Sequence, residues 1–184
     1  MMKRRVVVTG MGAVSPIGNT VEETWDGILN QVCGIDEITH FDTTDYKVKL
    51  AGEVKNLDLE QYFTKRELKF DDRFTQFARI VSKQAVENAK LDLESIDSQR
   101  FGVIIASGIG GVKSIEKAEQ SLLNRGPSKV SPYFIPMTLI NEAAGNVAID
   151  LGAKGYVSSV VTACAAGNQL VLSFDLLCIN AGSL

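Results

Sequence analysis

A chain of 184 residues that is 45% hydrophobic and 22% charged has the composition of a soluble globular protein and the length of about one domain. Its net charge of −3, with basic and acidic residues interleaved, argues against a nucleic-acid-binding protein, which carries a concentrated basic face. The longest apolar stretch, residues 170–179, is shorter than the ~20 residues that span a bilayer. Neither nucleic acid nor membrane is therefore an expected partner, and a cytoplasmic location is expected.

The first quarter of the chain predicts two strands and a helix. Residues 3–9 contain three consecutive valines and end at a glycine, which predicts a buried strand. A turn with Ser-Pro and Gly-Asn follows, and a helix is expected from about residue 20 to 32, because two glutamates suit the positive end of its dipole. Residues 34–47 resemble a loop, and residues 48–54 a short strand.

The middle of the chain contains the clearest helix pattern. From Phe74, apolar residues recur at offsets 0, 3, 4, 7 and 11, which is one face of a helix beginning near Arg73. Residues 101–106 form a continuous apolar run that predicts a strand. It leads into the glycine-rich turn SGIGG at 107–111 and then into a more polar helix that ends near residue 124.

The last third of the chain predicts another helix, another strand and a final helix. After the proline-marked segment RGPSKVSPYFIP, a helix is expected over about 138–151 and a strand over 156–162. The run at 170–179 is apolar on nearly every face of a helix, as in a central helix. Strands alternating with helices predict an α/β fold with a mostly parallel sheet covered on both faces.

Cys164 stands where the last predicted strand gives way to a helix, in the segment VVTACAAGN at 160–168. Backbone N–H groups at such a corner favour a thiolate and could hold an oxyanion during acyl transfer. The very small neighbours leave room for an acyl chain on the sulfur. The other interpretation is a small buried apolar residue, because free cysteine is commonly buried. The spacing alone leaves both interpretations open.

The remaining cysteines and the histidine do not predict a metal site. Cys33, Cys164 and Cys178 include no CxxC pair and are odd in number, which argues against a disulfide framework and against zinc. The single histidine, His40, lies in a loop-like stretch and is expected to be a surface or capping residue. No metal and no cofactor are predicted.

Four segments, taken in order, resemble the β-ketoacyl-[acyl carrier protein] synthase family, most closely its type II elongation enzymes. They are VVVTGMGAVSPIGN near the start, SGIGG at 107–111, GPSKVSPYFIPMT at 126–138 and VTACAAGN around Cys164. The resemblance implies the N-terminal half of a thiolase-like fold and a homodimer. It also implies a reaction in which a fatty acyl group passes from acyl carrier protein to a cysteine. Malonyl carrier protein is then decarboxylated, and its carbanion attacks the thioester.

The resemblance also implies roles for individual residues. Cys164 would be the nucleophile, and its backbone N–H would be a donor to the oxyanion. Residues implied at the acyl-chain site are Gly108, Ile109 and Ala163, with Phe134 and Thr138 at the dimer interface near the partner's pocket. Residues implied to meet the acidic acyl carrier protein are Lys65, Arg66 and Lys69. From the residues alone, the SGIGG residues also fit an ordinary βα turn. Phe134 and Thr138 also fit ordinary core packing, and the three basic residues also fit a solvated helix face.

The end of the sequence departs from the resembled family. The family's two catalytic histidines, a lysine and a phenylalanine gate belong to a second half that would follow Leu184, and His40 matches none of them. The tail LSFDLLCINAGSL loses the expected small-residue pattern and is interpreted as a frameshifted or prematurely ended reading. We therefore expect residues 1–184 to form a truncated N-terminal synthase domain that does not catalyse condensation alone.

Three other interpretations remain open. A truncated, non-catalytic product could dimerise or bind acyl carrier protein through Arg66 and Lys69. A nucleotide-binding module is suggested by Gly10-x-Gly12 after a predicted strand, but Ser15 and Pro16 break the expected G-x-G-x-x-G pattern. Within the resembled family, a priming enzyme or a polyketide ketosynthase domain is the alternative to an elongation enzyme.

Overall fold

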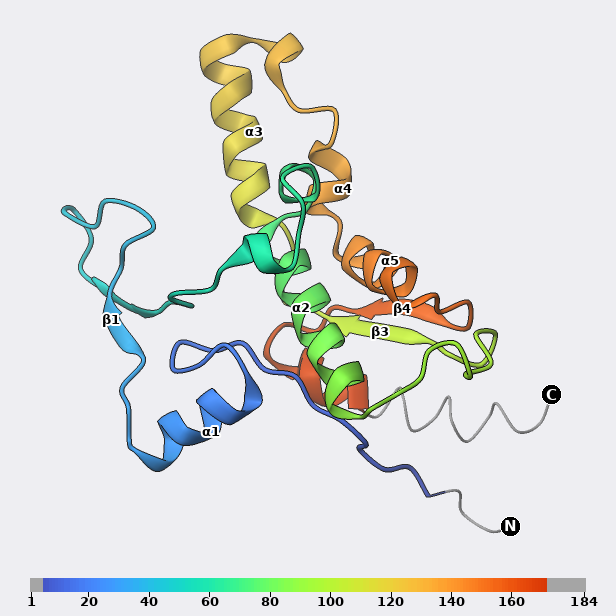
Figure 1. Cartoon of the computed structure of the whole chain (residues 1–184). Helices are drawn as coiled ribbons and strands as arrows, with labels where there is room; N and C mark the ends of the chain where they lie inside the picture. The colour runs from blue at the N-terminus through green and yellow to red at the C-terminus, as the bar shows by residue number, and fades with distance from the viewer. Residues whose placement is uncertain (1–4, 172–184) are drawn as a thin grey trace.

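The computed structural model of the protein describes residues 5–171 (Figure 1). Its helices and strands are α1 (Val21–Leu29), β1 (Ile35–Glu37), β2 (Leu50–Gly52), α2 (Arg73–Asn88), β3 (Val103–Ala106), α3 (Val112–Arg125), α4 (Phe134–Thr138), α5 (Ile140–Leu151) and β4 (Val157–Val160). Short 3-10 turns occupy Leu59–Gln61, Glu67–Lys69, Pro127–Lys129 and Ala163–Ala165, and residues 166–171 are helical. Within the described ranges no helix is long and apolar enough to cross a membrane.

The core forms where α5 meets a parallel pair of strands. β3 and β4 pair from Val103 opposite Val157 to Ala106 opposite Val160, and α5 packs against both strands and against α2 (Figure 1). Ala144 on α5 is completely buried, because an alanine-rich helix can approach its neighbours closely. The parallel pair and its helix confirm the predicted α/β class.

Local capping fixes the starts of the first two predicted helices, α1 and α2. The Thr20 hydroxyl accepts a hydrogen bond from the Glu23 N–H, and the Glu23 carboxylate accepts one from the Asn19 N–H, so α1 begins with reciprocal caps. Asp72 caps α2 by accepting from the Phe74 N–H. Both helices therefore begin where the sequence predicts them.

The valine-rich segment near the N-terminus is not a strand in the structure. Residues 5–9 have no strand conformation, and Val8 is 82% exposed. A buried strand needs neighbouring strands that accept its hydrogen bonds and cover its side chains, and neither β3 nor β4 pairs with this segment. The prediction of a buried strand over residues 3–9 is therefore wrong for the part that the structure describes.

Other element predictions differ in their bounds. The loop expected over 34–47 contains β1, which pairs with β2 in an antiparallel ribbon apart from the β3–β4 pair (Figure 1, left). The helix expected from residue 138 begins at Ile140, because residues 134–138 form the separate helix α4. Most of the apolar helix predicted over 170–179, and Cys178 with it, lies outside the described residues.

Candidate functional site

The turn that carries Cys164 follows the end of β4. β4 ends at Val160, Thr162 stands before the 3-10 turn Ala163–Ala165, and an α-helix begins at residue 166. Ala163 has a φ of 47°, a left-handed conformation that turns the backbone sharply from strand into helix. The Cys164 side chain is exposed, so it is not the buried apolar residue of the alternative interpretation.

The backbone N–H of Cys164 lies at the start of the 3-10 turn. The first hydrogen bond of the turn is donated by the Ala165 N–H to the Thr162 carbonyl, at 3.0 Å. The Cys164 N–H comes one residue before this bond, so it is one of the N–H groups at a helix start that have no partner within the helix. A thiol at this position that attacks a carbonyl carbon would leave the resulting oxyanion near this N–H group.

The SGIGG turn lies at the same edge of the sheet as Cys164. Because β3 and β4 run parallel, the turns after their carboxyl ends emerge side by side, and the Ser107 N–H donates to the Val160 carbonyl at 3.2 Å. Ile109 is 71% exposed at the tip of this turn. A Cβ on Gly108 would meet no atom within 4 Å, so open space surrounds that position.

The residues from the proline-marked segment lie against the SGIGG turn. The Gly111 N–H donates to the Thr138 carbonyl at 3.3 Å, and Thr138 is the last residue of α4. Phe134, at the start of α4, is half-buried. The structure thus brings Thr138 and the SGIGG turn into contact and places Cys164 at the adjoining strand end.

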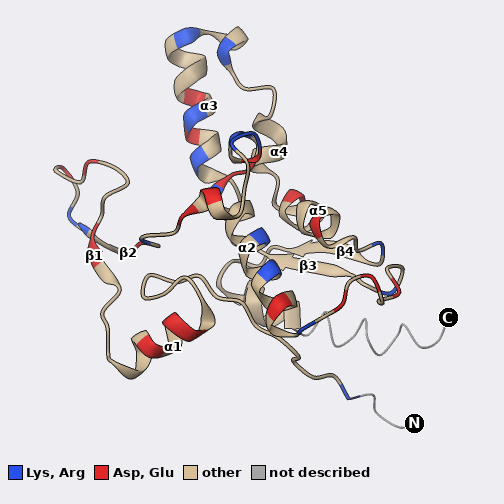
Figure 2. Cartoon of the chain, viewed as in Figure 1, with Lys and Arg blue, Asp and Glu red and all other residues tan. Residues whose placement is uncertain are grey.

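The basic cluster Lys65, Arg66 and Lys69 lies on an exposed turn beside the entry to α4. All three side chains are exposed, and the Arg66 guanidinium lies 5.7 Å from the centre of the Phe70 ring. Phe70 packs on Tyr133 with ring centres 4.2 Å apart, which joins the turn to the segment leading into α4. Figure 2 shows the blue-coloured basic turn beside α4. The cluster is therefore accessible and has a defined place in the fold.

A cluster of charged side chains that the sequence analysis missed lies behind this turn. Arg79 on α2 donates to Glu67 at 2.8 Å, to Asp71 at 2.6 Å and to Asp150 at 2.6 and 2.8 Å. Its guanidinium also lies 4.8 Å from the centre of the Phe63 ring. The four charged residues span residues 67 to 150, so no local motif reveals the cluster.

The environment of the cluster shifts the pKa values of its members in different directions. The Thr64 N–H, followed by Arg79, lowers the pKa of Glu67 to about 2. Burial raises the pKa of Asp71 above its ordinary value, even though Arg79 opposes the shift. Burial would lower the pKa of Arg79, but its hydrogen bonds to the carboxylates outweigh that effect and raise it.

His40 and Cys33 both lie outside the turn that carries Cys164. His40 is exposed in the loop between β1 and β2, with Nε2 3.9 Å from Glu53, and it lines a pocket together with Gly110 of the SGIGG turn. Cys33 is exposed before β1. In residues 5–171, no group of three or more His, Cys, Asp or Glu side chains is arranged to hold a metal ion.

A family model described as "Beta-ketoacyl synthase, N-terminal domain" matches residues 3–176. The chain belongs to the β-ketoacyl synthase family. Two curated family members are named 3-oxoacyl-[acyl-carrier-protein] synthase 2. The one from Staphylococcus aureus (strain COL) is 49% identical over 168 residues, and the one from Synechocystis sp. is 46% identical over 169. These matches cover 91% and 92% of this chain but 41% of each relative, so the chain spans about two fifths of their length.

Solved ketosynthase structures confirm the fold of this β-ketoacyl synthase domain. A structure described as the ishigamide ketosynthase/chain length factor matches with a TM-score of 0.83 and 28% identity, covering 99% of this chain and 45% of that one. A type II PKS acyl-carrier protein in complex with its ketosynthase matches with a TM-score of 0.82 and 23% identity, covering 97% and 49%. The predicted thiolase-like half-fold is thus confirmed.

Proposed function

We propose that this chain is the acyl-accepting part of a 3-oxoacyl-[acyl-carrier-protein] synthase of fatty acid synthesis, with Cys164 as its nucleophile. The observation that carries the proposal is the exposed thiol on a sharp left-handed turn between β4 and a helix. In support, curated relatives that carry this name are 46% and 49% identical over nine tenths of the chain. Residues 1–184 would form one truncated domain.

The proposed chemistry within this chain is acyl transfer. The Cys164 thiolate attacks the thioester carbon of an acylated carrier protein and forms a new C–S bond. The electron pair of the old C–S bond leaves with the carrier protein's sulfur, which takes up a proton. The Cys164 N–H would stabilise the oxyanion formed between these steps. Decarboxylation and condensation would depend on groups beyond this chain.

The residues around the thiol suit an acyl chain. Gly108 and the exposed Ile109 adjoin the strand end that carries Cys164, and Ala163 adds little bulk next to the sulfur. Thr138 lies against the same turn through the Gly111 N–H, and Phe134 begins the same short helix. In the proposed homodimer, Phe134 and Thr138 would approach the partner's acyl chain.

The proposed partner is an acyl carrier protein, which would dock on Lys65, Arg66 and Lys69. These basic side chains are exposed and lie on one turn, and such a turn favours an acidic partner. A ketosynthase of the same fold has been solved with a carrier protein bound. A cytoplasmic location would fit this partner. The docking proposal requires no condensation activity, so it also covers a non-catalytic product.

Acylation in vitro tests the proposal. The native polypeptide that carries these residues is incubated with acylated carrier protein, and its intact mass and tryptic peptides are measured. The expected result is one acyl adduct on the peptide that contains Cys164 and none in a Cys164→Ala variant. Cys33→Ala is the matched control because Cys33 is also an exposed free thiol. An adduct that persists in Cys164→Ala, or its absence from the parent protein, would overturn the nucleophile assignment.

A further inference from the structure

Glu67 joins the basic turn to the interior through both of its carboxylate oxygens. Its Oε2 accepts from the Thr64 N–H at 2.8 Å and from the Thr64 hydroxyl at 2.7 Å, which closes the turn that begins at Thr64. Its Oε1 accepts from Arg79 at 2.8 Å. One side chain therefore both closes the turn and ties it to α2.

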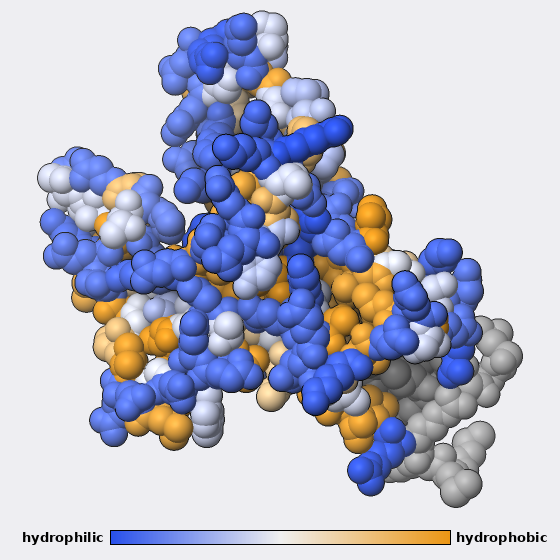
Figure 3. Space-filling view, in the orientation of Figure 1, coloured by the Kyte–Doolittle hydropathy of each residue, from blue (hydrophilic) through white to orange (hydrophobic). Residues whose placement is uncertain are grey.

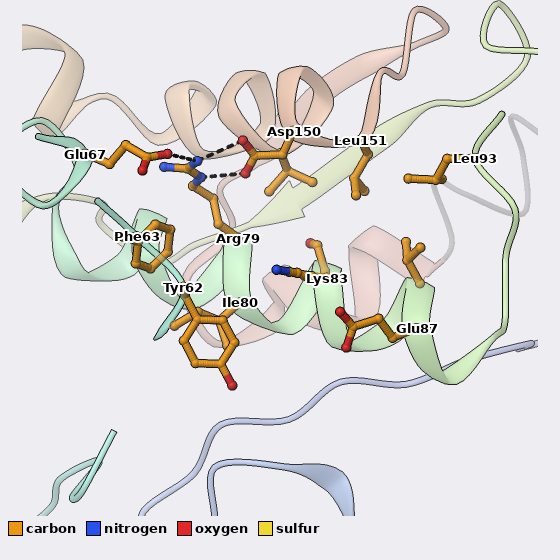
Figure 4. Close-up of a pocket in the computed structure, with 13 residues that line it drawn as sticks. Tyr62, Phe63, Glu67, Arg79, Ile80, Lys83, Glu87, Leu93, Asp150 and Leu151 are labelled. Atoms are coloured by element: carbon orange, nitrogen blue, oxygen red, sulfur yellow. Dashed lines mark hydrogen bonds and ion pairs between the residues drawn. The ribbon is translucent and has the colours of Figure 1, made fainter. Parts of the chain in front are cut away.

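Arg79 is itself held firmly. Its side chain is only 12% exposed, and it donates to Glu67 and to Asp150 on α5 (Figure 4). It also donates to Asp71. Its guanidinium lies over the Phe63 ring. A pocket of about 470 Å³ beside Arg79 is lined by this cluster and not by Cys164. Arg79 is thus held in one position between α2 and α5.

The three basic residues lie on the segment that Glu67 closes. Lys65 and Arg66 fall between Thr64 and Glu67, and Lys69 ends the 3-10 turn Glu67–Lys69. Long basic side chains on an unanchored turn would lose more conformational freedom on binding than the same side chains on an anchored one. The link from Glu67 to Arg79 therefore decides how well ordered the basic surface is before a partner arrives.

We infer that Glu67 is a positioning residue for carrier-protein docking: anchored by Arg79, it holds Lys65, Arg66 and Lys69 in one arrangement that an acidic partner recognises. This inference rests on the proposed docking function and adds a residue that touches no partner atom. It also explains why an acidic side chain lies inside a basic cluster, although its negative charge would weaken the attraction of the cluster for an acidic partner.

A Glu67→Gln variant separates positioning from charge attraction. Removing a negative charge beside a basic cluster should strengthen binding to an acidic partner if long-range attraction alone matters. Glutamine, however, has one accepting oxygen and one donating NH₂ group, so it cannot accept from Thr64 and from Arg79 on separate atoms. Arg79 keeps Asp71 and Asp150, so the interior of the fold stays intact.

Fluorescence anisotropy with a labelled acyl carrier protein measures the dissociation constant on the native polypeptide that carries this chain. We expect Glu67→Gln to weaken binding about tenfold, as does Glu67→Asp, which keeps the charge but not the reach. Glu53→Gln is the matched control, because Glu53 also accepts from a threonine N–H and hydroxyl, at Thr39, and is not part of the basic turn. That control should bind like the parent.

The possible results distinguish failure of the positioning inference from failure of the docking function. Unchanged or tighter binding by Glu67→Gln, while Arg66→Ala with Lys69→Ala weakens binding, would overturn the positioning inference and leave the docking function standing. No binding by the parent protein would overturn the docking function, and the inference with it. Hydrogen exchange gives a second readout: amides of residues 64–70 should exchange faster in Glu67→Gln than in the parent. Weaker binding without faster exchange would also overturn the positioning role.

Discussion

At the scale of single residues, Ala163 shows how the backbone is bent to present a thiol. A left-handed conformation costs a residue with a Cβ about 1 kcal/mol or more, and here the cost falls immediately before the exposed Cys164. Alanine keeps the position small, and the positive φ turns the chain from strand into helix. The strained residue is thus part of what positions the proposed nucleophile.

Replacing Ala163 tests that interpretation. Ala163→Gly should raise the free energy of unfolding by about 1 kcal/mol, because glycine adopts the left-handed conformation without steric cost. Ala163→Val should lower it, because a β-branched residue fits that region worst. Urea denaturation measures both. Ala165→Gly is the matched control in the same turn, and it should destabilise because Ala165 is helical. Equal effects of the two glycine variants would contradict the prediction.

The lowered pKa of Glu67 predicts a pH-dependent contribution to stability. A carboxylate whose pKa falls from 4.5 to about 2 on folding stabilises the protein above pH 4.5 and loses that effect as the pH falls toward 2. The difference in unfolding free energy between the parent and Glu67→Gln should therefore shrink over this interval. Asp71, whose pKa is raised, acts in the opposite sense, but it is present in both proteins and largely cancels.

Urea denaturation from pH 2 to pH 6 measures this difference. Glu60→Gln is a suitable reference, because Glu60 lies in a neighbouring 3-10 turn and has no ion pair among the described residues. A constant difference between the parent and Glu67→Gln over the whole pH range would show that the carboxylate does not contribute through its charge.

At the scale of elements, the SGIGG turn is held by close backbone contact on one side and open on the other. A Cβ on Gly111 would lie 2.1 Å from the Met137 carbonyl oxygen, whereas a Cβ on Gly108 would meet nothing within 4 Å. Two glycines of one motif therefore serve different purposes. Gly111 lets α4 pack against the turn, and Gly108 leaves space at the edge where we propose the acyl chain to lie.

The two glycines provide a matched pair of alanine substitutions. Gly111→Ala should lower the unfolding free energy by about 1–3 kcal/mol, because backbone atoms must move apart. Gly108→Ala should leave stability nearly unchanged and slow acylation of Cys164 by long acyl chains more than by short ones. Thermal unfolding and acylation rates measure these effects. Equal destabilisation by the two substitutions would contradict the close-contact argument.

Burial predicts which isoleucines support the packed helices. Ile80 on α2 is 1% exposed, and Ile149 on α5 is 78% exposed. Ile80→Ala should lower the unfolding free energy by about 2–5 kcal/mol, because it removes buried atoms and leaves a cavity. Ile149→Ala removes the same atoms from an exposed position and should change it by less than about 0.5 kcal/mol. Chemical denaturation of both variants checks the contrast.

At the scale of the whole molecule, much apolar surface is uncovered. Val8, Leu123 and Ile149 are each more than three-quarters exposed, and Figure 3 shows apolar patches between the polar side chains on the face in view. Large exposed apolar surface is uncommon on a monomeric soluble protein and marks a region where other protein packs. The chain spans 41% of the length of its Staphylococcus aureus relative, and this partial coverage agrees with the uncovered apolar surface.

Dye binding tests the whole-molecule interpretation. The isolated 184-residue chain should increase the fluorescence of a dye that binds apolar surface, and it should self-associate in gel filtration. Co-expression with the remaining C-terminal part of the Staphylococcus aureus relative should reduce both signals. A monodisperse monomer that does not bind the dye would show that the exposed apolar residues need no cover.

The sequence by itself determined the helix starts at α1 and α2, the strands β3 and β4, and the family to which the chain belongs. Caps, helical periodicity, apolar runs and motifs such as VTACAAGN depend on residues close together in the chain, so they can be read locally. The strand-to-helix corner at Cys164 was predictable for the same reason, whereas the exposure of the thiol was not. Its role, and those of the basic and acyl-site residues, stay predictions.

Only the tertiary structure decided which distant residues meet. Arg79 and Asp150 are 71 positions apart, and no local pattern pairs them, because their contact depends on how α2 packs against α5. The valine run over residues 5–9 failed as a predicted strand for a related reason. A strand is completed by the hydrogen bonds and side chains of its neighbours, and a run of valines supplies only one partner of that pairing.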